Sequence, residues 1–180
     1  MIDFSSILAI PYNMSILKRY NVPGNTYFVT AVTHKRASLL IQNYDLLLES
    51  MRRAHKKGRF RLDAWVVLPD HIHLLLEPDE EDLSSLMRRI KLSFAHMLLN
   101  RRGQTSGTVW QRRFWDHLIR NDSDLNRHFD YIHYNPVKHG FVDRTASWPH
   151  SSFEMFVAKG YYERDWRVMD SRWLEGEFGE

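Results

Sequence analysis

The chain has 180 residues, of which 43% are hydrophobic and 26% are charged, the balance expected of one globular domain over residues 1–180. It has no cysteine, which excludes disulfides and thiolate metal sites. No apolar stretch approaches the roughly 20 residues that span a bilayer, and the first residues lack the positive charge of a secretory signal, so a cytoplasmic protein is expected.

The first half of the chain predicts three strands and one helix. Residues 26–33 are rich in β-branched and aromatic side chains and follow a Pro-Gly-Asn turn, as is typical of a strand. Apolar residues then recur at helical spacing in the segment 42–57. Residues 61–68 and 71–77 predict two further strands, and the short link between them favours an antiparallel hairpin.

The segment after this hairpin predicts a helix and one more strand. Residues 77–82 are acidic, which suits the positive end of a helix dipole, and an apolar stripe runs from Leu83 to Leu98. Residues 101–107 predict a loop. Residues 109–110 and 114–120 together offer the fourth strand.

A last major helix follows the fourth strand. Asp122-Ser123-Asp124 is expected to cap it, and it should run to about His139 and end at Gly140. The order β-α-β-β-α-β predicts an α+β protein with a ferredoxin-like antiparallel sheet, to which this helix is an addition. Residues 158–180 form an acidic C-terminal extension.

Positive charge is concentrated in two blocks. Between Leu83 and Trp115 there is no acidic residue, and residues 52–61 carry six positive charges and no negative one. A single block of this kind is also typical of a solvated surface. Two such blocks favour a polyanionic partner, namely nucleic acid.

His71 and His73 are the first candidate site residues. Because side chains alternate along a strand, both imidazoles should lie on one face, with Asp70 and Ile72 on the other. Two imidazoles on one face can hold a divalent metal, although His-x-His in a strand is also found as a structural or surface pair.

Tyr131 and Asn135 are the second pair of candidates, on the last helix. At 100° per residue they lie about 40° apart, on one flank of the apolar stripe. Tyr134 falls opposite the stripe, toward solvent. Pro136 lacks an N–H group and is expected to kink the helix beside Asn135. If this helix packs against the histidine strand, Tyr131 can act as a nucleophile and the Asn135 amide as a ligand for Mg²⁺ or Mn²⁺.

Three longer motifs resemble a known family. They are Trp65-Val66-Val67-Leu68-Pro69-Asp70-His71-Ile72-His73, Gly107-Thr108-Val109-Trp110-Gln111-Arg112-Arg113-Phe114-Trp115-Asp116-His117, and Asp130-Tyr131-Ile132-His133-Tyr134-Asn135-Pro136-Val137-Lys138-His139-Gly140. Together with Trp148–Phe153 they resemble the REP-associated tyrosine transposases, bacterial relatives of the IS200/IS605-type transposases in the HUH nuclease superfamily. The resemblance covers about residues 20–157.

This resemblance implies a metal-dependent endonuclease and strand transferase acting on single-stranded DNA that carries REP-type hairpins. His71, His73 and Asn135 would bind Mg²⁺ or Mn²⁺, and Tyr131 would form a 5′-phosphotyrosine link. A nucleoid-associated monomer is expected, with a dimer left open. The residues expected to contact DNA are Arg88, Arg89, Lys91, Arg112, Arg113 and Lys138.

Two other functions follow from the same residues. A ferredoxin-like sheet with aromatic side chains also describes a catalytically silent module that binds single-stranded DNA or an RNA hairpin. A two-histidine phosphoesterase would need two separated His-x-Ser/Thr motifs, and only His150-Ser151-Ser152 fits that pattern.

Overall fold

The computed structural model describes residues 25–79, 82–168 and 178–179. Its four strands form one antiparallel sheet in the order β2-β3-β1-β4. The strands are β1 (Tyr27–Val32), β2 (Phe60–Val67), β3 (His71–Pro78) and β4 (Trp115–Leu118). The main helices are α1 (Tyr44–Lys57), α2 (Leu83–Arg101), α3 (Asp122–Lys138) and α4 (Phe153–Ala158), with short 3-10 turns at His34–Arg36, Ile41–Asn43 and Thr145–Ser147. The predicted α+β class and antiparallel ferredoxin-like order are confirmed.

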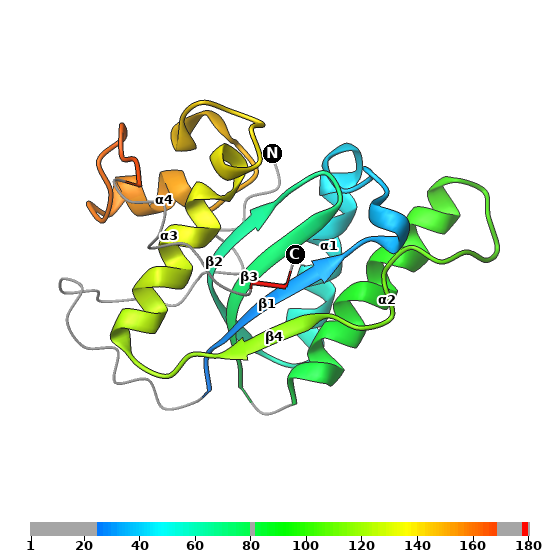
Figure 1. Cartoon of the computed structure of the whole chain (residues 1–180). Helices are drawn as coiled ribbons and strands as arrows, with labels where there is room; N and C mark the ends of the chain where they lie inside the picture. Colours follow the sequence, from blue (N-terminus) through cyan, green and yellow to red (C-terminus); the bar gives the residue numbers. More distant parts are fainter. Residues whose placement is uncertain (1–24, 80–81, 169–177, 180) are drawn as a thin grey trace.

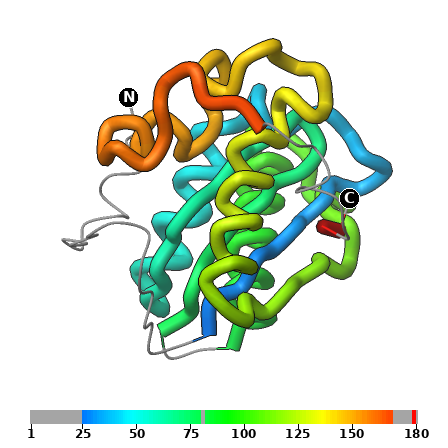
Figure 2. The backbone as a smooth tube through the Cα atoms, turned by 60° about the vertical axis from the view of Figure 1, so that its left-hand side comes forward, coloured from blue at the N-terminus to red at the C-terminus, as the bar shows by residue number. Residues whose placement is uncertain are grey.

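The sheet separates two layers of helices. The helices α1 and α2 pack against one another and cover one face, whereas α3 and α4 lie on the other (Figure 1 and Figure 2). Alternate strand residues supply the two cores, as the pleat requires. Val29 and Leu74 belong to the core under α1 and α2, and Phe28 and Leu75 belong to the core under α3.

The fourth strand is shorter than the sequence predicts. Only Trp115–Leu118 pair with β1, while Trp110 forms an isolated bridge with Thr33. The segment between them is held by Lys91, whose Nζ donates to the carbonyl oxygens of Gln111 at 2.8 Å and Arg112 at 3.2 Å. The segment is thus held by these bonds and by the Gln111 N–H group, which donates to the Val32 carbonyl at 2.9 Å, and not by a continuous strand ladder.

Helix α3 begins and ends close to the predicted residues. Its N-cap is Asn121, whose side chain accepts from the Asp124 N–H group at 2.9 Å. The cap therefore lies one residue before the predicted segment Asp122-Ser123-Asp124. The acids of that segment lie instead in the first turn, where they favour the helix dipole. The helix continues through Pro136, and Gly140 ends it with a φ of 70°.

The chain after α3 returns to the sheet edge and fixes α3 to β2. Ser151 forms an isolated bridge with Val66, and the Trp148 indole N–H donates to the Val67 carbonyl at 3.0 Å. Buried Ser152 lies 2.8 Å from His133 Nε2 and also accepts from the Trp65 N–H group at 3.0 Å. Complete burial lowers the pKa of His133 to about 3, so this imidazole is neutral.

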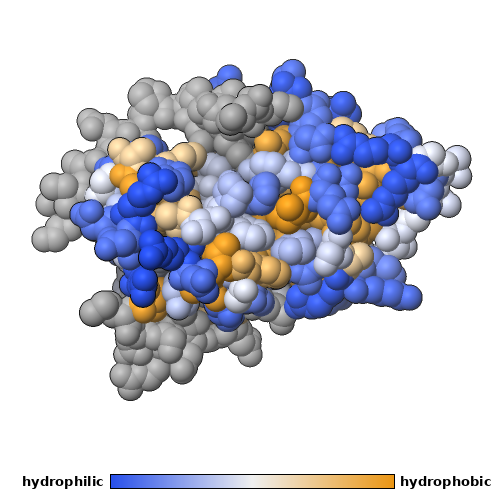
Figure 3. Space-filling view, turned by 90° about the horizontal axis from the view of Figure 1, so that it is seen from above, coloured by the Kyte–Doolittle hydropathy of each residue, from blue (hydrophilic) through white to orange (hydrophobic). Residues whose placement is uncertain are grey.

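Polar residues dominate the surface seen from above, and apolar residues gather there in a few small areas (Figure 3). Within the described ranges, none of the helices combines the length and apolar character needed to cross a membrane.

Candidate metal and tyrosine site

The two histidines of β3 lie on the sheet face that α3 covers, as strand alternation predicts. His71 and His73 are 1% and 0% exposed, and their ring centroids are 4.9 Å apart. Strand β3 is internal in the sheet, between β2 and β1, so its backbone is fixed from both sides. The imidazoles therefore project from a rigid part of the fold.

Asp70 sets the orientation of His71. Its carboxylate lies 2.6 Å from His71 Nδ1 and 3.0 Å from an Arg36 guanidinium nitrogen. The expectation that Asp70 points to the opposite face is wrong, because Asp70 belongs to the turn before β3 and does not follow the strand pleat. Burial raises the pKa of Asp70, but the bonds to His71 and Arg36 outweigh it, so the net shift is downward. A carboxylate can only accept here, so the His71 proton is on Nδ1 and the lone pair is on Nε2.

Thr30 orients His73 in the same way. The Thr30 hydroxyl donates to the Phe178 carbonyl at 2.5 Å, so at 2.8 Å it accepts the proton of His73 Nδ1. The lone pair of His73 is then on Nε2, and the Asn135 amide nitrogen lies 3.3 Å from it.

Asn135 brings an amide to the same buried group as His73. Its side chain is fully buried beside His73, in spite of the neighbouring Pro136. Rotation of the amide by half a turn exchanges its nitrogen for its oxygen without moving the backbone. Two imidazoles that carry their lone pairs on Nε2 and one amide oxygen are ligand types that Mg²⁺ or Mn²⁺ can accept.

Tyr131 lies one helical turn before Asn135 and belongs to the same buried group. Its ring centroid is 5.4 Å from that of His73, and Lys138 Nζ donates to its hydroxyl oxygen at 3.0 Å. The Phe178 ring stacks on the Tyr131 ring with centroids 3.5 Å apart and an interplanar angle of 8°. Tyr131 is 0% exposed.

Tyr134 is only partly exposed, although the helical wheel places it toward solvent. It packs against the α3 core, and its ring meets that of Trp166 edge-on at 6.3 Å. The reason is that the chain beyond α4 passes over this side of the helix, which a helical wheel of α3 alone cannot show. The wheel nevertheless identifies Tyr131 as the tyrosine that lies beside the histidines.

His139 is a neighbour of the site that sequence reasoning missed. Its ring centroid is 5.3 Å from that of His71, at the C-terminal end of α3. The spacing from Asn135 to His139 is one helical turn, and that is the signal that could have drawn attention to it.

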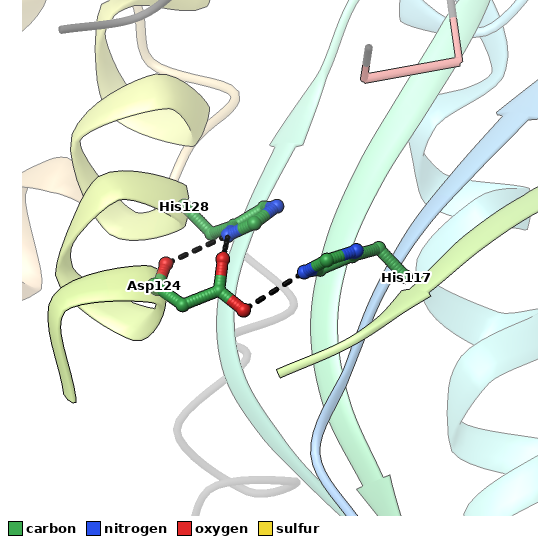
Figure 4. A group of neighbouring side chains, drawn as sticks. All are labelled: His117, Asp124 and His128. Atoms are coloured by element: carbon green, nitrogen blue, oxygen red, sulfur yellow. Dashed lines mark hydrogen bonds and ion pairs between the residues drawn. The ribbon is translucent and has the colours of Figure 1, made fainter. Parts of the chain in front are cut away.

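A second group of possible metal ligands joins β4 to α3 (Figure 4). His117, Asp124 and His128 each offer one ligand atom, all within 4.8 Å of one another. Asp124 lies 2.8 Å from His117 Nε2, and His128 Nδ1 lies 2.7 Å from the Asp124 carbonyl oxygen. A carbonyl oxygen only accepts, so His128 Nδ1 carries a proton and the lone pair of this ring is on Nε2. The group on β3 and α3 would need only a rotation of the Asn135 amide to present three possible ligand atoms.

The residues predicted to contact DNA are divided between the two sides of the sheet. Arg88, Arg112, Arg113 and Lys138 are exposed, and Arg89 is partly exposed. Lys91 is 9% exposed, and burial lowers its pKa. Its bonds to the 111–112 backbone make it an anchor of that segment.

Helices α1 and α2 border a basic groove on the side of the sheet away from Tyr131. Its volume is about 740 Å³, and its lining residues are His55, Lys56, Lys57, Gly58, Arg59, Asp79 and Arg89. An adjoining hollow shares Lys56, Lys57 and Arg89. Four of these lining residues are Lys or Arg and one is acidic, so the groove suits an anionic partner.

Comparisons with known proteins show which family this chain resembles. Residues 21–135 match the family of IS200-like transposases. The chain is 40% identical over 158 residues to the REP-associated tyrosine transposase of Escherichia coli (strain K12), covering 85% of this chain and 91% of that protein. It is also similar to a solved structure of a REP-associated tyrosine transposase bound to a REP hairpin. That similarity has a TM-score of 0.77 and 38% identity, and it covers 93% of this chain and 98% of the other.

Proposed function

Because the chain belongs to the IS200-like transposases, and among them to the REP-associated tyrosine transposases, we propose that it cleaves and rejoins single-stranded DNA beside REP-type hairpins. The observation that carries this proposal is the buried group formed by His73, Tyr131 and Asn135. A solved relative is bound to a REP hairpin, which supports the same class of partner here.

Tyr131 is the proposed nucleophile. Its oxygen forms a bond to phosphorus while the bond between phosphorus and the 3′-oxygen breaks. The 3′-oxygen leaves with the electron pair and takes up a proton, and the tyrosine proton passes to water. The resulting 5′-phosphotyrosine conserves a phosphodiester bond, so a 3′-hydroxyl can later displace Tyr131 and restore the strand.

The family implies a divalent metal, and we assign it to His71, His73 and Asn135. When bound, Mg²⁺ or Mn²⁺ would polarise the scissile phosphate and stabilise the charge that develops on it. Asp70 and Thr30 would support metal binding, because their bonds to Nδ1 hold both imidazoles in the tautomer whose lone pair is on Nε2.

The basic groove between α1 and α2 is the proposed surface for the duplex part of the hairpin. Lys56, Lys57 and Arg59 line it, and Arg88 and Arg89 lie on the adjoining helix. Phosphate contacts of this kind position DNA without reading its sequence.

The decisive experiment is formation of a covalent adduct. The full chain, incubated with Mn²⁺ and an end-labelled hairpin oligonucleotide with a single-stranded flank, should give a labelled protein band on a denaturing gel. Tyr131→Phe should abolish that band, and Tyr134→Phe, the matched control three residues away, should keep it. An adduct that survives Tyr131→Phe would refute the assignment. Hairpin binding with no adduct in the wild type would favour the silent binding module.

A further inference from the structure

The Lys138 ammonium contacts the hydroxyl group of Tyr131. Its Nζ lies 3.0 Å from the Tyr131 hydroxyl oxygen and 4.7 Å from the centre of the ring. The two residues are seven positions apart on α3, which is two helical turns. Long side chains on a helix lean toward its N-terminus, so Lys138 reaches back to the tyrosine.

The direction of this bond is fixed by chemistry. A lysine ammonium has three donors and no acceptor, so Lys138 donates to the tyrosine oxygen. The positive charge is therefore placed at the atom that would attack phosphorus. Lys138 is exposed whereas Tyr131 is buried, so the ammonium lies on the solvent side of that oxygen.

We propose that Lys138 is a catalytic residue, which stabilises negative charge on the Tyr131 oxygen during both cleavage and rejoining. This rests on the proposed function of Tyr131 as the nucleophile. In rejoining, the bond between phosphorus and the tyrosine oxygen breaks, and that oxygen leaves with the electron pair. A fixed donor aimed at the oxygen stabilises this charge, as donors in an oxyanion hole do. Cleavage passes through the same transition state in reverse, so it benefits equally.

A simpler role for Lys138 is contact with a DNA phosphate, the role that the sequence suggests. The two roles differ in what they change. A phosphate contact contributes to affinity and to its salt dependence. A donor to the tyrosine oxygen contributes to the rate of the bound complex, because its interaction strengthens only as charge develops.

The test compares Lys138→Gln with Lys138→Arg in the full chain. Single-turnover rates of adduct formation and of rejoining are measured with saturating hairpin DNA and Mn²⁺. The dissociation constant for DNA is measured by fluorescence anisotropy in a Tyr131→Phe background, where no adduct can form. Lys159→Gln, which removes an exposed lysine after α4, is the control for removal of one charge.

Lys138→Gln should lower both rates by about 10²-fold, the effect of removing one such donor. Its dissociation constant for DNA should stay within about twofold of the control, and Lys138→Arg should recover most of the rate because it retains a charged donor. Unchanged thermal unfolding and Mn²⁺ affinity would show that the fold and the metal site are intact.

Two results would overturn the proposal for Lys138 alone. One is an unchanged rate at saturating DNA together with weaker binding, which would make Lys138 a phosphate contact. The other is an adduct rate in Lys138→Gln equal to that of the wild type with binding also unchanged. If the wild type forms no adduct at all, the proposed function itself fails and the role of Lys138 falls with it.

Discussion

The imidazoles at the centre of the site are oriented by neighbours outside the proposed ligand set. Asp70 accepts from His71, and Thr30 accepts from His73, each through Nδ1. Both bonds leave Nε2 as the coordinating atom and restrict rotation of the ring. Preorganisation of this kind raises metal affinity, since a ligand that is already oriented loses less rotational freedom on binding.

The proposed ligand set of His71, His73 and Asn135 predicts that the chain binds one metal ion. Titration with Mn²⁺, followed by calorimetry, should give one site per chain. His73→Ala should abolish that site, whereas His117→Ala should retain it, because His73 is one of the three proposed ligands and His117 is not. A stoichiometry of two that falls to one in His117→Ala would instead identify His117, Asp124 and His128 as a true metal site.

Sequence reasoning works for residues whose position depends on one regular element. The strand pleat puts His71 and His73 on one face, and the helical wheel puts Tyr131 beside Asn135. It cannot find Phe178, which stacks on Tyr131 from 47 positions away along the chain. It is also wrong for Asp70, because a turn residue follows no simple periodicity.

At the scale of elements, the position of α3 decides whether Tyr131 and Asn135 reach β3. The helix is attached through the buried group of His133, Ser152 and Trp65. The sequence predicts the helix and its end at Gly140, because caps and stops are local signals. It does not reveal this attachment, since His133 and Ser152 meet only when the chain after α3 folds back on β2.

Stability should fall in acid because of His133. Its pKa of about 3 in the folded chain lies below the ordinary 6.5, so between these values only the unfolded chain binds the proton. The contribution is complete above about pH 6.5 and is lost as the pH falls toward 3, with a slope of up to about 1.4 kcal/mol per pH unit. Urea unfolding at several pH values should show a smaller slope for His133→Gln. The exposed His34→Gln is the matched control, and equal slopes in both variants would contradict the assignment.

At the scale of the whole molecule, distant parts of the chain meet over Tyr131. Phe178 stacks on the tyrosine ring, and its carbonyl accepts from Thr30, 148 positions earlier. Tyr131 is fully buried in this arrangement, and the Phe178 ring is one of the groups that cover it, so we expect DNA to reach the tyrosine faster when this stacking opens.

Phe178→Ala should therefore speed adduct formation. An aromatic pair contributes about 0.5–1.5 kcal/mol beyond its buried area, so the rate should rise by about two- to tenfold. Single-turnover adduct assays with saturating hairpin DNA would measure this change. An unchanged or slower rate would show that Phe178 does not limit access to Tyr131.

The proposed nucleophile Tyr131 and the basic α1–α2 groove lie on opposite sides of the sheet. We therefore expect that substitutions in the groove change the affinity for DNA without changing the rate of adduct formation. Lys57→Ala with Arg59→Ala removes two cations of the α1–α2 groove, across the sheet from Tyr131. Affinity for hairpin DNA should fall, and the slope of log K against log salt should decrease by about 0.7–0.9 for each phosphate that the variant no longer neutralises. The adduct rate at saturating DNA should be retained, because no group near the tyrosine changes. Lys159→Ala controls for charge alone, and an unaltered salt slope in the groove variant would place the duplex elsewhere on the protein.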